Sequence, residues 1–275
     1  MSTYLTILGY NSAIPTVKSA PTAQFLEMEE RCFLIDCGEG TQVQLRKAKA
    51  KFSKINHIFI SHLHGDHVFG LPGLISSFRL LGREIPLHVY GPKGIKEMME
   101  TIFRITETHQ GFEVVFHELS SKKSEKVFED NRVEVFTIPL DHRIYCNGYL
   151  FKEKPKERHL NMQEISKYPE IEICDYHNLK RGKDIQLSDG YILKNENLTK
   201  PAEPSVSYAF CSDTRYLESI IPIIKNVDVL YHEATFLHDL KKMADYTGHS
   251  TALEAAKIAR KANVKKLILG HFSNR

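Results

Sequence analysis

The sequence predicts an α/β protein of layered sheets and helices whose polar side chains gather at one edge of the sheets. Short apolar runs that are typical of buried strands alternate with helical segments along the 275 residues. Acidic and histidine side chains follow several of these strands, and in a layered α/β fold such loops lie along one edge, where sites form. The residues at these strand ends are Asp36, His62, His142, Asp213, Glu233 and His271.

Composition and charge narrow the class of protein. Apolar residues make up 42% of the chain, and no run of about eighteen apolar residues indicates a transmembrane helix. The N-terminus lacks the basic region and long apolar stretch of a signal peptide. Five cysteines, an odd number without CxxC spacing, favour a reduced protein. We therefore expect a cytoplasmic protein, and the net charge of +3 indicates that any nucleic-acid partner is bound by local patches.

The first half of the chain is expected to form short strands with helices between them. The helix expected at 43–51 is rich in lysine and arginine and has no acidic residue. Contact with phosphates and a merely solvated helix face explain that charge equally well. The other expected elements are strands at 4–8, 24–27, 32–35, 58–60, 87–92, 113–118 and 133–138, and helices at 74–81 and 93–105.

The second half contains a segment of different character. Residues 153 to about 203 are polar, contain three prolines with a fourth at Pro204, and show weak periodicity, so we expect a protruding arm; a disordered surface loop is the alternative. The chain is thus expected to be one domain over 1–275 with an arm inserted at about 153–203. Thr251 and Glu254 have the spacing of a capping box before a helix at 253–262. Strands are expected at 146–152, 207–211, 227–231 and 267–269.

The most informative stretch is Ser61-His62-Leu63-His64-Gly65-Asp66-His67, which directly follows the apolar run at 58–60. We expect it to be a loop that leads into a helix. Its imidazole and carboxylate groups suit zinc. Four ligands packed this closely cannot all bind one tetrahedral ion without strain. We therefore expect His62 and His64 to bind one metal, and Asp66 and His67 to bind another, which outlines a two-metal hydrolytic site.

Three residues at other strand ends complete two ligand sets. Asp213 is a carboxylate able to bridge the two metals. Zinc ions about 3.5–4 Å apart would share a water, lower its pKa and neutralise charge in a phosphorane-like transition state. The first set is expected to be His62, His64 and His142, and the second Asp66, His67 and His271.

Four of the candidate residues have expected roles in proton transfer or orientation. Asp66 can ligate a metal and also accept the proton of the attacking water. Asp36 is expected to orient a ligand histidine. His249 and Glu233 are expected to form an acid pair in which His249 protonates the leaving oxygen. The alternative for His249 is a histidine that only packs at the start of a helix.

These motifs resemble the metallo-β-lactamase superfamily and, within it, the ribonuclease Z family of endonucleases, which remove 3′ trailers from precursor tRNA. The narrower motifs lie at 36–42, 210–215, 232–235 and 248–251, and the resemblance covers nearly the whole chain. It implies a four-layer αββα sandwich, two Zn²⁺ per chain, a homodimer, and an arm that binds tRNA from the partner subunit. The chain departs from the family pattern at 174–182, which lacks the Gly-Pro pair usual in the arm.

Three functions follow as hypotheses. The first is a zinc-dependent endoribonuclease that cleaves precursor tRNA and leaves a 3′-hydroxyl on the tRNA. The second is a di-zinc phosphodiesterase or esterase that acts on small substrates without an RNA partner. The third is an RNA-binding protein whose site no longer turns over, and the complete ligand sets argue against it.

Overall fold

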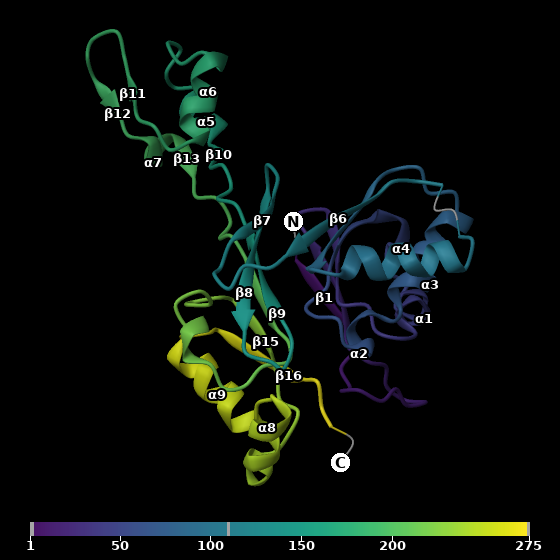
Figure 1. Cartoon of the computed structure of the whole chain (residues 1–275). Helices are drawn as coiled ribbons and strands as arrows, with labels where there is room; N and C mark the ends of the chain where they lie inside the picture. Colours follow the sequence, from purple (N-terminus) through teal and green to yellow (C-terminus); the bar gives the residue numbers. More distant parts are fainter. Residues whose placement is uncertain (1–2, 109–110, 274–275) are drawn as a thin grey trace. The chain divides into compact units, whose positions relative to one another are not determined.

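The computed structural model describes residues 3–108 and 111–273 and separates them into two compact units (Figure 1). Unit 1 contains the chain up to Glu153 and resumes at Val206. Unit 2 is Lys154–Ser205. Each unit has hydrophobic side chains buried within it, so each is a compact body in itself.

One half of unit 1 is a six-stranded sheet in the order β1-β2-β3-β4-β5-β6. The first three strands pair antiparallel, and β3 to β6 run parallel. The strands are β1 (Tyr4–Gly9), β2 (Ala23–Met28), β3 (Arg31–Ile35), β4 (Ile55–Phe59), β5 (Leu87–Pro92) and β6 (Val114–Leu119). The helices of this half are α1 (Thr41–Lys47), α2 (Gly65–Val68), α3 (Leu71–Leu80) and α4 (Ile95–Ile105), with a 3-10 turn at Phe52–Lys54.

The other half of unit 1 is a mixed six-stranded sheet in the order β16-β15-β14-β9-β8-β7. In this sheet β14, β15 and β16 run parallel, and β9 runs antiparallel to both β14 and β8. The strands are β7 (Lys126–Glu129), β8 (Val133–Leu140), β9 (Cys146–Glu153), β14 (Ser207–Cys211), β15 (Val229–Glu233) and β16 (Lys266–Gly270). Its helices are α8 (Lys241–Thr247) and α9 (Ala252–Lys261), with 3-10 turns at Glu218–Ile220 and His238–Leu240.

The two sheets face each other across an aromatic core. The rings of Phe33 and Phe151 lie 5.3 Å apart between centroids, and those of Phe59 and Tyr149 lie 5.1 Å apart. Successive side chains of β4 point to opposite faces of the sheet, so this one strand contributes to the packing on both faces. Phe59 therefore packs against the second sheet, whereas Ile58 packs in the layer that includes the helices.

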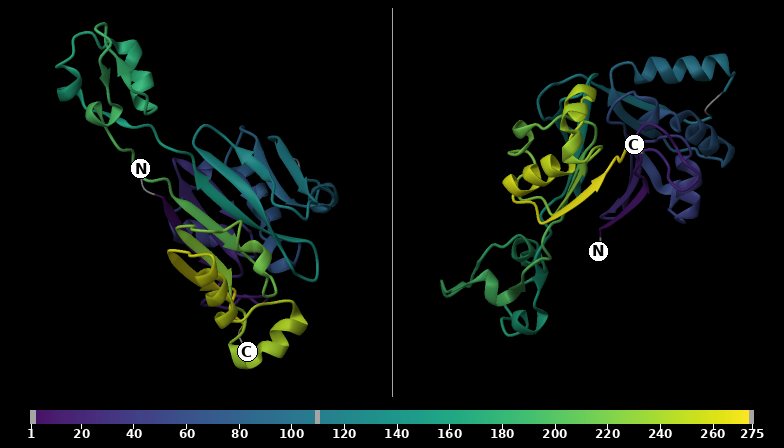
Figure 2. Two further views of the ribbon diagram at one scale, coloured as in Figure 1. Left: turned by 90° about the vertical axis from the view of Figure 1, so that its left-hand side faces the viewer. Right: turned by 90° about the horizontal axis from the view of Figure 1, so that it is seen from below.

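Helices cover the outer face of each sheet (Figure 2). Leu45 of α1, Leu74 of α3 and Met99 of α4 belong to the core on the first sheet. Ile258 of α9 packs in the core on the second sheet together with Leu230 of β15. The layers are thus helix, sheet, sheet and helix, and the αββα sandwich is confirmed.

Unit 2 has ordered elements and a small core. Its buried side chains are Ile165, Ile171, Leu179, Leu193 and Leu198. They are too far apart in sequence to produce a helical or strand period, which is why the sequence indicated only a polar segment. The elements are β10 (His159–Leu160), α5 (Met162–Ile165), α6 (Ile173–Lys180), β11 (Ile185–Gln186), β12 (Ile192–Leu193), α7 (Asn195–Leu198) and β13 (Thr199–Lys200).

Several expectations about the elements were wrong. Helix α1 ends at Lys47 rather than residue 51, and Lys49 has a left-handed backbone with φ of 53°, which a helix cannot contain. Strand β15 continues to Glu233 instead of ending at residue 231. Asp66 and His67 lie in the short helix α2 rather than in a loop, and α8 and β7 were not predicted. Across the part of the chain that the structure describes, no helix has the length and apolar character needed to span a bilayer.

Candidate metal centre

Strands that end at a common edge bring the candidate residues together. In the first sheet β3 and β4 are parallel, and in the second β8, β14, β15 and β16 share one direction. Asp36 and His271 follow β3 and β16 with φ of 56° and 58°, so the chain turns sharply out of the sheet at both positions. This left-handed region is uncommon for side chains other than glycine, and such strain often accompanies functional sites.

The first group of ligand atoms surrounds the imidazole of His64. Its Nδ1 lies 3.0 Å from His62 Nε2 and 3.4 Å from His142 Nε2. The Oδ2 atom of Asp213 lies 3.6 Å from His62 Nε2 and 3.8 Å from His142 Nε2. His62 is fully buried, whereas His64 is partly exposed. These four side chains converge closely enough to bind one metal ion.

The second group is formed by Asp66, His67 and His271. Asp66 Oδ2 lies 3.4 Å from His67 Nε2 and 3.5 Å from His271 Nε2. The backbone N–H of Ala13 donates to the same oxygen at 2.8 Å, which holds the carboxylate in place. This group is also compact enough to bind one metal ion.

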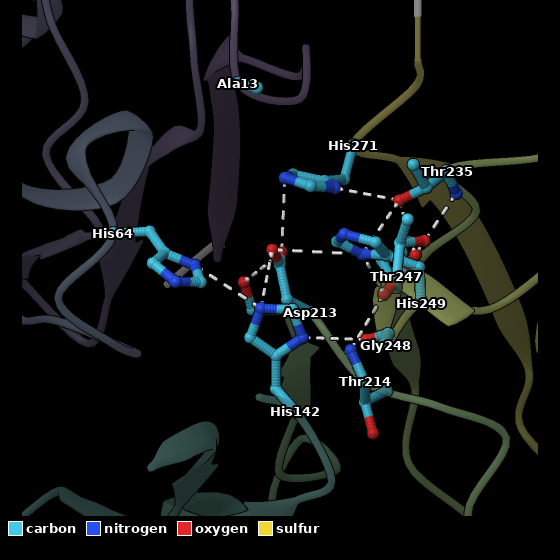
Figure 3. A network of polar contacts seen from close by, with 12 residues as sticks. Ala13, His64, His142, Asp213, Thr214, Thr235, Thr247, Gly248, His249 and His271 are labelled. Atoms are coloured by element: carbon cyan, nitrogen blue, oxygen red, sulfur yellow. Dashed lines mark hydrogen bonds and ion pairs between the residues drawn. The ribbon is translucent and has the colours of Figure 1, made fainter. Parts of the chain in front are cut away.

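Asp213 lies between the two groups, and its two oxygens face different ones. Oδ2 faces the first group, and Oδ1 lies 3.2 Å from His271 Nε2 and 3.4 Å from His67 Nε2 in the second. Figure 3 shows the imidazoles of His142, His249 and His271 around this carboxylate. The arrangement is that of a bridging carboxylate.

Two observations indicate that the groups fit divalent metals. Tetrahedral zinc ligands at about 2.0–2.1 Å from the ion lie roughly 3.3 Å from one another, and the separations given above are 3.0–3.8 Å. The Nε2 atoms of His67 and His271 are buried and have no hydrogen-bond partner among the residues described. An unsatisfied buried nitrogen is costly unless another group binds it.

Four of the candidate ligand histidines have a partner on their other ring nitrogen. Such a contact fixes the ring and leaves the opposite nitrogen for a metal. Asp36 was expected to orient a ligand histidine, and its carboxylate is indeed bonded to His67. The Nδ1 partners are Ser61 Oγ for His62 at 3.0 Å, Asp36 Oδ2 for His67 at 2.8 Å, the Gly248 carbonyl for His142 at 2.7 Å and Thr235 Oγ1 for His271 at 2.9 Å.

Burial and charge set the protonation of the site. Burial lowers the pKa of His62 and of His142, so both imidazoles stay neutral and have a lone pair to donate. Burial alone would raise the pKa of Asp213, but the surrounding histidines, His271 first among them, hold this pKa well below its usual range. Asp213 is therefore ionised, as a metal-bridging carboxylate must be.

His249 and Glu233 form a pair beside the two groups. His249 Nδ1 lies 2.9 Å from Glu233 Oε1 and 3.9 Å from Asp213 Oδ2. Burial would lower the pKa of His249, but the hydrogen bond to Glu233 and the charges of Glu233 and Asp213 outweigh it and raise this pKa. The imidazole is thus suited to carry and donate a proton.

A cavity of about 350 Å³ opens onto the site. His64, Asp66 and His249 line it, as does Arg143, a cation that follows the ligand candidate His142. A phosphate group entering this space would meet both the guanidinium and the candidate metal groups.

The structure brings together all the residues that the sequence singled out at strand ends. One placement was different: Glu233 is the last residue of β15 rather than a loop residue, and it is fully buried. Sequence reasoning missed the parts played by Ser61, Thr235 and Arg143. Each lies within two residues of a candidate, and that proximity was the only available signal, because neither hydroxyl nor guanidinium is a zinc ligand.

Comparison with known proteins gives three kinds of match. A family model described as "Anti-Pycsar protein Apyc1" matches residues 3–155. Ribonuclease Z of Bacteroides thetaiotaomicron is 45% identical over 271 residues, which cover 98% of this chain and 85% of that protein. Ribonuclease Z of Porphyromonas gingivalis is 46% identical over 269 residues, which cover 98% of this chain and 88% of that protein.

Solved structures share the fold. Human tRNase Z, short form, has a TM-score of 0.75 and 28% identity, with 98% of this chain and 93% of that chain covered. The metallo-beta-lactamase fold protein YhfI from Bacillus subtilis has a TM-score of 0.67 and 18% identity, with 99% and 87% covered. The second likeness concerns the fold alone.

Proposed function

We propose that this chain is an endoribonuclease that removes the 3′ trailer from precursor tRNA. The chain belongs to the ribonuclease Z family. Over residues 3–155 it also belongs to the family described as anti-Pycsar protein Apyc1. The observation that carries the proposal is the position of Asp213, which joins two metal-binding groups beside the Glu233–His249 pair. Relatives named Ribonuclease Z at 45–46% identity support the choice of substrate.

Two zinc ions per chain are part of this proposal. His62, His64 and His142 would bind one and Asp66, His67 and His271 the other, with Asp213 between them. Zinc bound there would supply positive charge beside the scissile phosphate and a water of low pKa. His249 also lies near Asp213 and His271. We assign it to proton transfer instead, because the nitrogen that lies 3.9 Å from Asp213 Oδ2 is Nδ1, and Glu233 already engages this same atom at 2.9 Å.

The protein side chains would move two protons during hydrolysis. Asp66 accepts a proton from the attacking water, whose oxygen forms a bond to phosphorus. The bond between phosphorus and the 3′ oxygen of the tRNA breaks, and His249 donates a proton to that oxygen. The products are a 3′-hydroxyl on the tRNA and a phosphate on the 5′ end of the trailer.

Unit 2 is the proposed arm for tRNA. Lys180, Arg181 and Lys183 lie at and just after the end of α6, and the last two are exposed. Side chains of this kind bind the phosphate backbone. We further propose a cytoplasmic homodimer in which the arm of one subunit binds tRNA cleaved by the other. Light scattering of the purified protein at low salt tests the dimer directly.

End-mapping of the products from a precursor tRNA tests the function. The expected products are a tRNA with a 3′-hydroxyl and a trailer with a 5′-phosphate. The same preparation is given a small chromogenic phosphodiester as a second substrate. Hydrolysis of the small ester without cleavage of any precursor tRNA would favour the alternative, a small-substrate phosphodiesterase. If zinc-loaded protein cleaves neither the precursor tRNA nor the small phosphodiester, both the endoribonuclease and the small-substrate phosphodiesterase would be contradicted.

A further inference from the structure

The hydroxyl of Thr235 contacts three side chains of the site, and the proposed function does not use it. Thr235 follows β15 by two residues and is 6% exposed. Its Oγ1 lies 2.6 Å from Glu233 Oε2, 2.9 Å from His271 Nδ1 and 3.3 Å from His249 Nδ1. Figure 3 shows the threonine beside both imidazoles. A buried hydroxyl with one proton and several partners has defined donor and acceptor roles.

Glu233 determines those roles. Its Oε1 accepts from the backbone N–H of Thr214 at 2.8 Å, and its Oε2 accepts from the backbone N–H of Thr235 at 3.2 Å. Backbone N–H groups can only donate, and an ionised carboxylate can only accept. The Thr235 hydroxyl therefore donates its single proton to Oε2, at the short distance typical of a charge-assisted bond.

The lone pairs of the same hydroxyl face His271. Because they can only accept, Nδ1 of His271 must be the protonated nitrogen. Nε2 is then the nitrogen left to bind a metal, and it lies 3.2 Å from Asp213 Oδ1 and 3.5 Å from Asp66 Oδ2. We propose that Thr235 is a positioning residue that transmits the orientation of Glu233 to His271 and fixes the tautomer that presents Nε2 to a metal.

This inference rests on the metal groups of the proposed function and gives Glu233 a second role. Oε1 of Glu233 holds His249, the proposed acid, and Oε2 holds His271 through Thr235. A single buried carboxylate would therefore align both a proton donor and a metal ligand. Loss of a hydrogen bond that orients a metal ligand typically lowers metal affinity by about 10–100-fold.

Two substitutions at position 235 separate the hydroxyl from the shape of the side chain. Thr235→Val keeps the shape and removes the hydroxyl, whereas Thr235→Ser keeps the hydroxyl. Thr137→Val is a matched control, because Thr137 is 1% exposed and its hydroxyl bonds backbone groups of residues 123–125. Long-range proton–nitrogen NMR of the metal-free proteins reports the tautomer of each imidazole, and a His271→Gln spectrum assigns the His271 signal.

The expected result is an Nδ1-protonated His271 in the parent, in Thr235→Ser and in Thr137→Val. In Thr235→Val this tautomer should lose its dominance, and chelator competition should show one zinc bound roughly 10–100-fold more weakly. His64→Ala, which disrupts the first group, identifies the weakened zinc as the one in the second group. Parent-like tautomer and zinc affinity in Thr235→Val would overturn the inference. Failure of Thr235→Ser to restore them would do the same, because the hydroxyl would then not be the cause.

These measurements are independent of the RNA substrate. If the parent protein does not cleave precursor tRNA, the proposed function fails, but the tautomer and zinc affinity still decide the role of Thr235. If the parent cleaves precursor tRNA and Thr235→Val behaves as the parent in both measurements, only the inference about Thr235 fails.

Discussion

Asp213 is a buried, charged carboxylate that lies between the two candidate metal groups. It is 3% exposed, and each of its oxygens faces a different group of ligands. A buried carboxylate is stable only when cationic or hydrogen-bonded partners offset its loss of hydration. The histidines around it hold its pKa well below the usual range. The negative charge is thus built into the site before any substrate arrives.

Replacing Asp213 should therefore affect both metals at once. Asp213→Ala is expected to reduce turnover of precursor tRNA to near background and to weaken both zinc ions, because the bridge is lost. Elemental analysis after dialysis against metal-free buffer measures zinc content. Asp239→Ala removes an exposed carboxylate and serves as the control. Retention of two tightly bound zinc ions by Asp213→Ala would contradict the bridging role.

His249 should behave differently, because its proposed role is proton transfer. His249→Ala is expected to slow cleavage by about 10²–10⁴-fold, the usual range for a lost acid–base group, with zinc content unchanged. Single-turnover kinetics and elemental analysis of the same sample test both parts. A variant that loses one zinc would show that His249 is a ligand and that the Glu233–His249 pair has been misinterpreted.

At the scale of single elements, three strands of the first sheet carry a row of histidines. His57 of β4, His88 of β5 and His117 of β6 lie side by side, with ring centroids 5.1 Å and 5.3 Å apart. Burial lowers the pKa of His57 to about 4, and the neighbouring His88 and His117 lower it too. Arg83 also lowers this pKa, whereas Asp130 raises it. His57 is therefore uncharged at neutral pH.

The low pKa of His57 predicts a loss of stability in acid. The unfolded chain protonates His57 near pH 6.5, whereas the folded protein resists protonation until about pH 4. Stability from this residue is complete above pH 6.5 and declines as the pH falls from 6.5 to 4, by at most about 3 kcal/mol. Urea unfolding at several pH values should show a smaller acid loss for His57→Gln than for the parent. Equal slopes would mean that His57 does not titrate in this window.

Local patterns explain which elements could be predicted. Helix α9 has the expected capping box: the Glu254 side chain accepts from the Thr251 backbone N–H at 3.0 Å, and Thr251 Oγ1 accepts from the Glu254 N–H at 3.3 Å. The strands before the site were visible because an apolar run of about five residues ends directly at a histidine or carboxylate. Both signals lie within a few neighbouring residues.

Features that depend on distant residues could not be predicted. The core of unit 2 brings Ile165 against residues such as Leu198, and neither belongs to a periodic segment. Ser61 and Thr235 acquire their roles only because folding places their hydroxyls against His62 and His271. A hydroxyl in the sequence carries no sign of the imidazole that it will meet, and Thr235 meets one 36 residues away.

At the scale of the whole molecule, unit 2 is separable from the chemistry. All candidate catalytic and metal-binding residues lie in unit 1. Replacing Lys154–Ser205 by a short Gly-Ser link should raise the KM for precursor tRNA sharply, because phosphate contacts are lost, while hydrolysis of a small phosphodiester stays within a few-fold of the parent. Steady-state kinetics on both substrates measures this. Equal losses on both would mean that unit 2 is needed for folding instead.

Charge-removing variants refine that experiment. A variant with Ala at positions 180, 181 and 183 should bind precursor tRNA more weakly and with a flatter dependence on salt. Lys167→Ala is the matched control, because Lys167 also lies in unit 2 but pairs with Glu164 at 2.8 Å. An equal effect of the control would point to general charge rather than to a defined contact.

The two candidate metal groups have a consequence for the stability of the whole sandwich. Each group takes side chains from both sheets: His62 and His64 follow β4 of the first, whereas His142 follows β8 of the second. A bound ion would therefore cross-link the two halves of unit 1.

A ligand at about 1,000 times its Kd stabilises the native state by about 4 kcal/mol. Removing zinc with a chelator should lower the Tm by roughly 5–15 °C, and added zinc should restore it. An unchanged Tm would exclude such a cross-link. If bound zinc does cross-link the two halves of unit 1, the supply of zinc would determine how much of the protein stays folded as well as how fast the enzyme works.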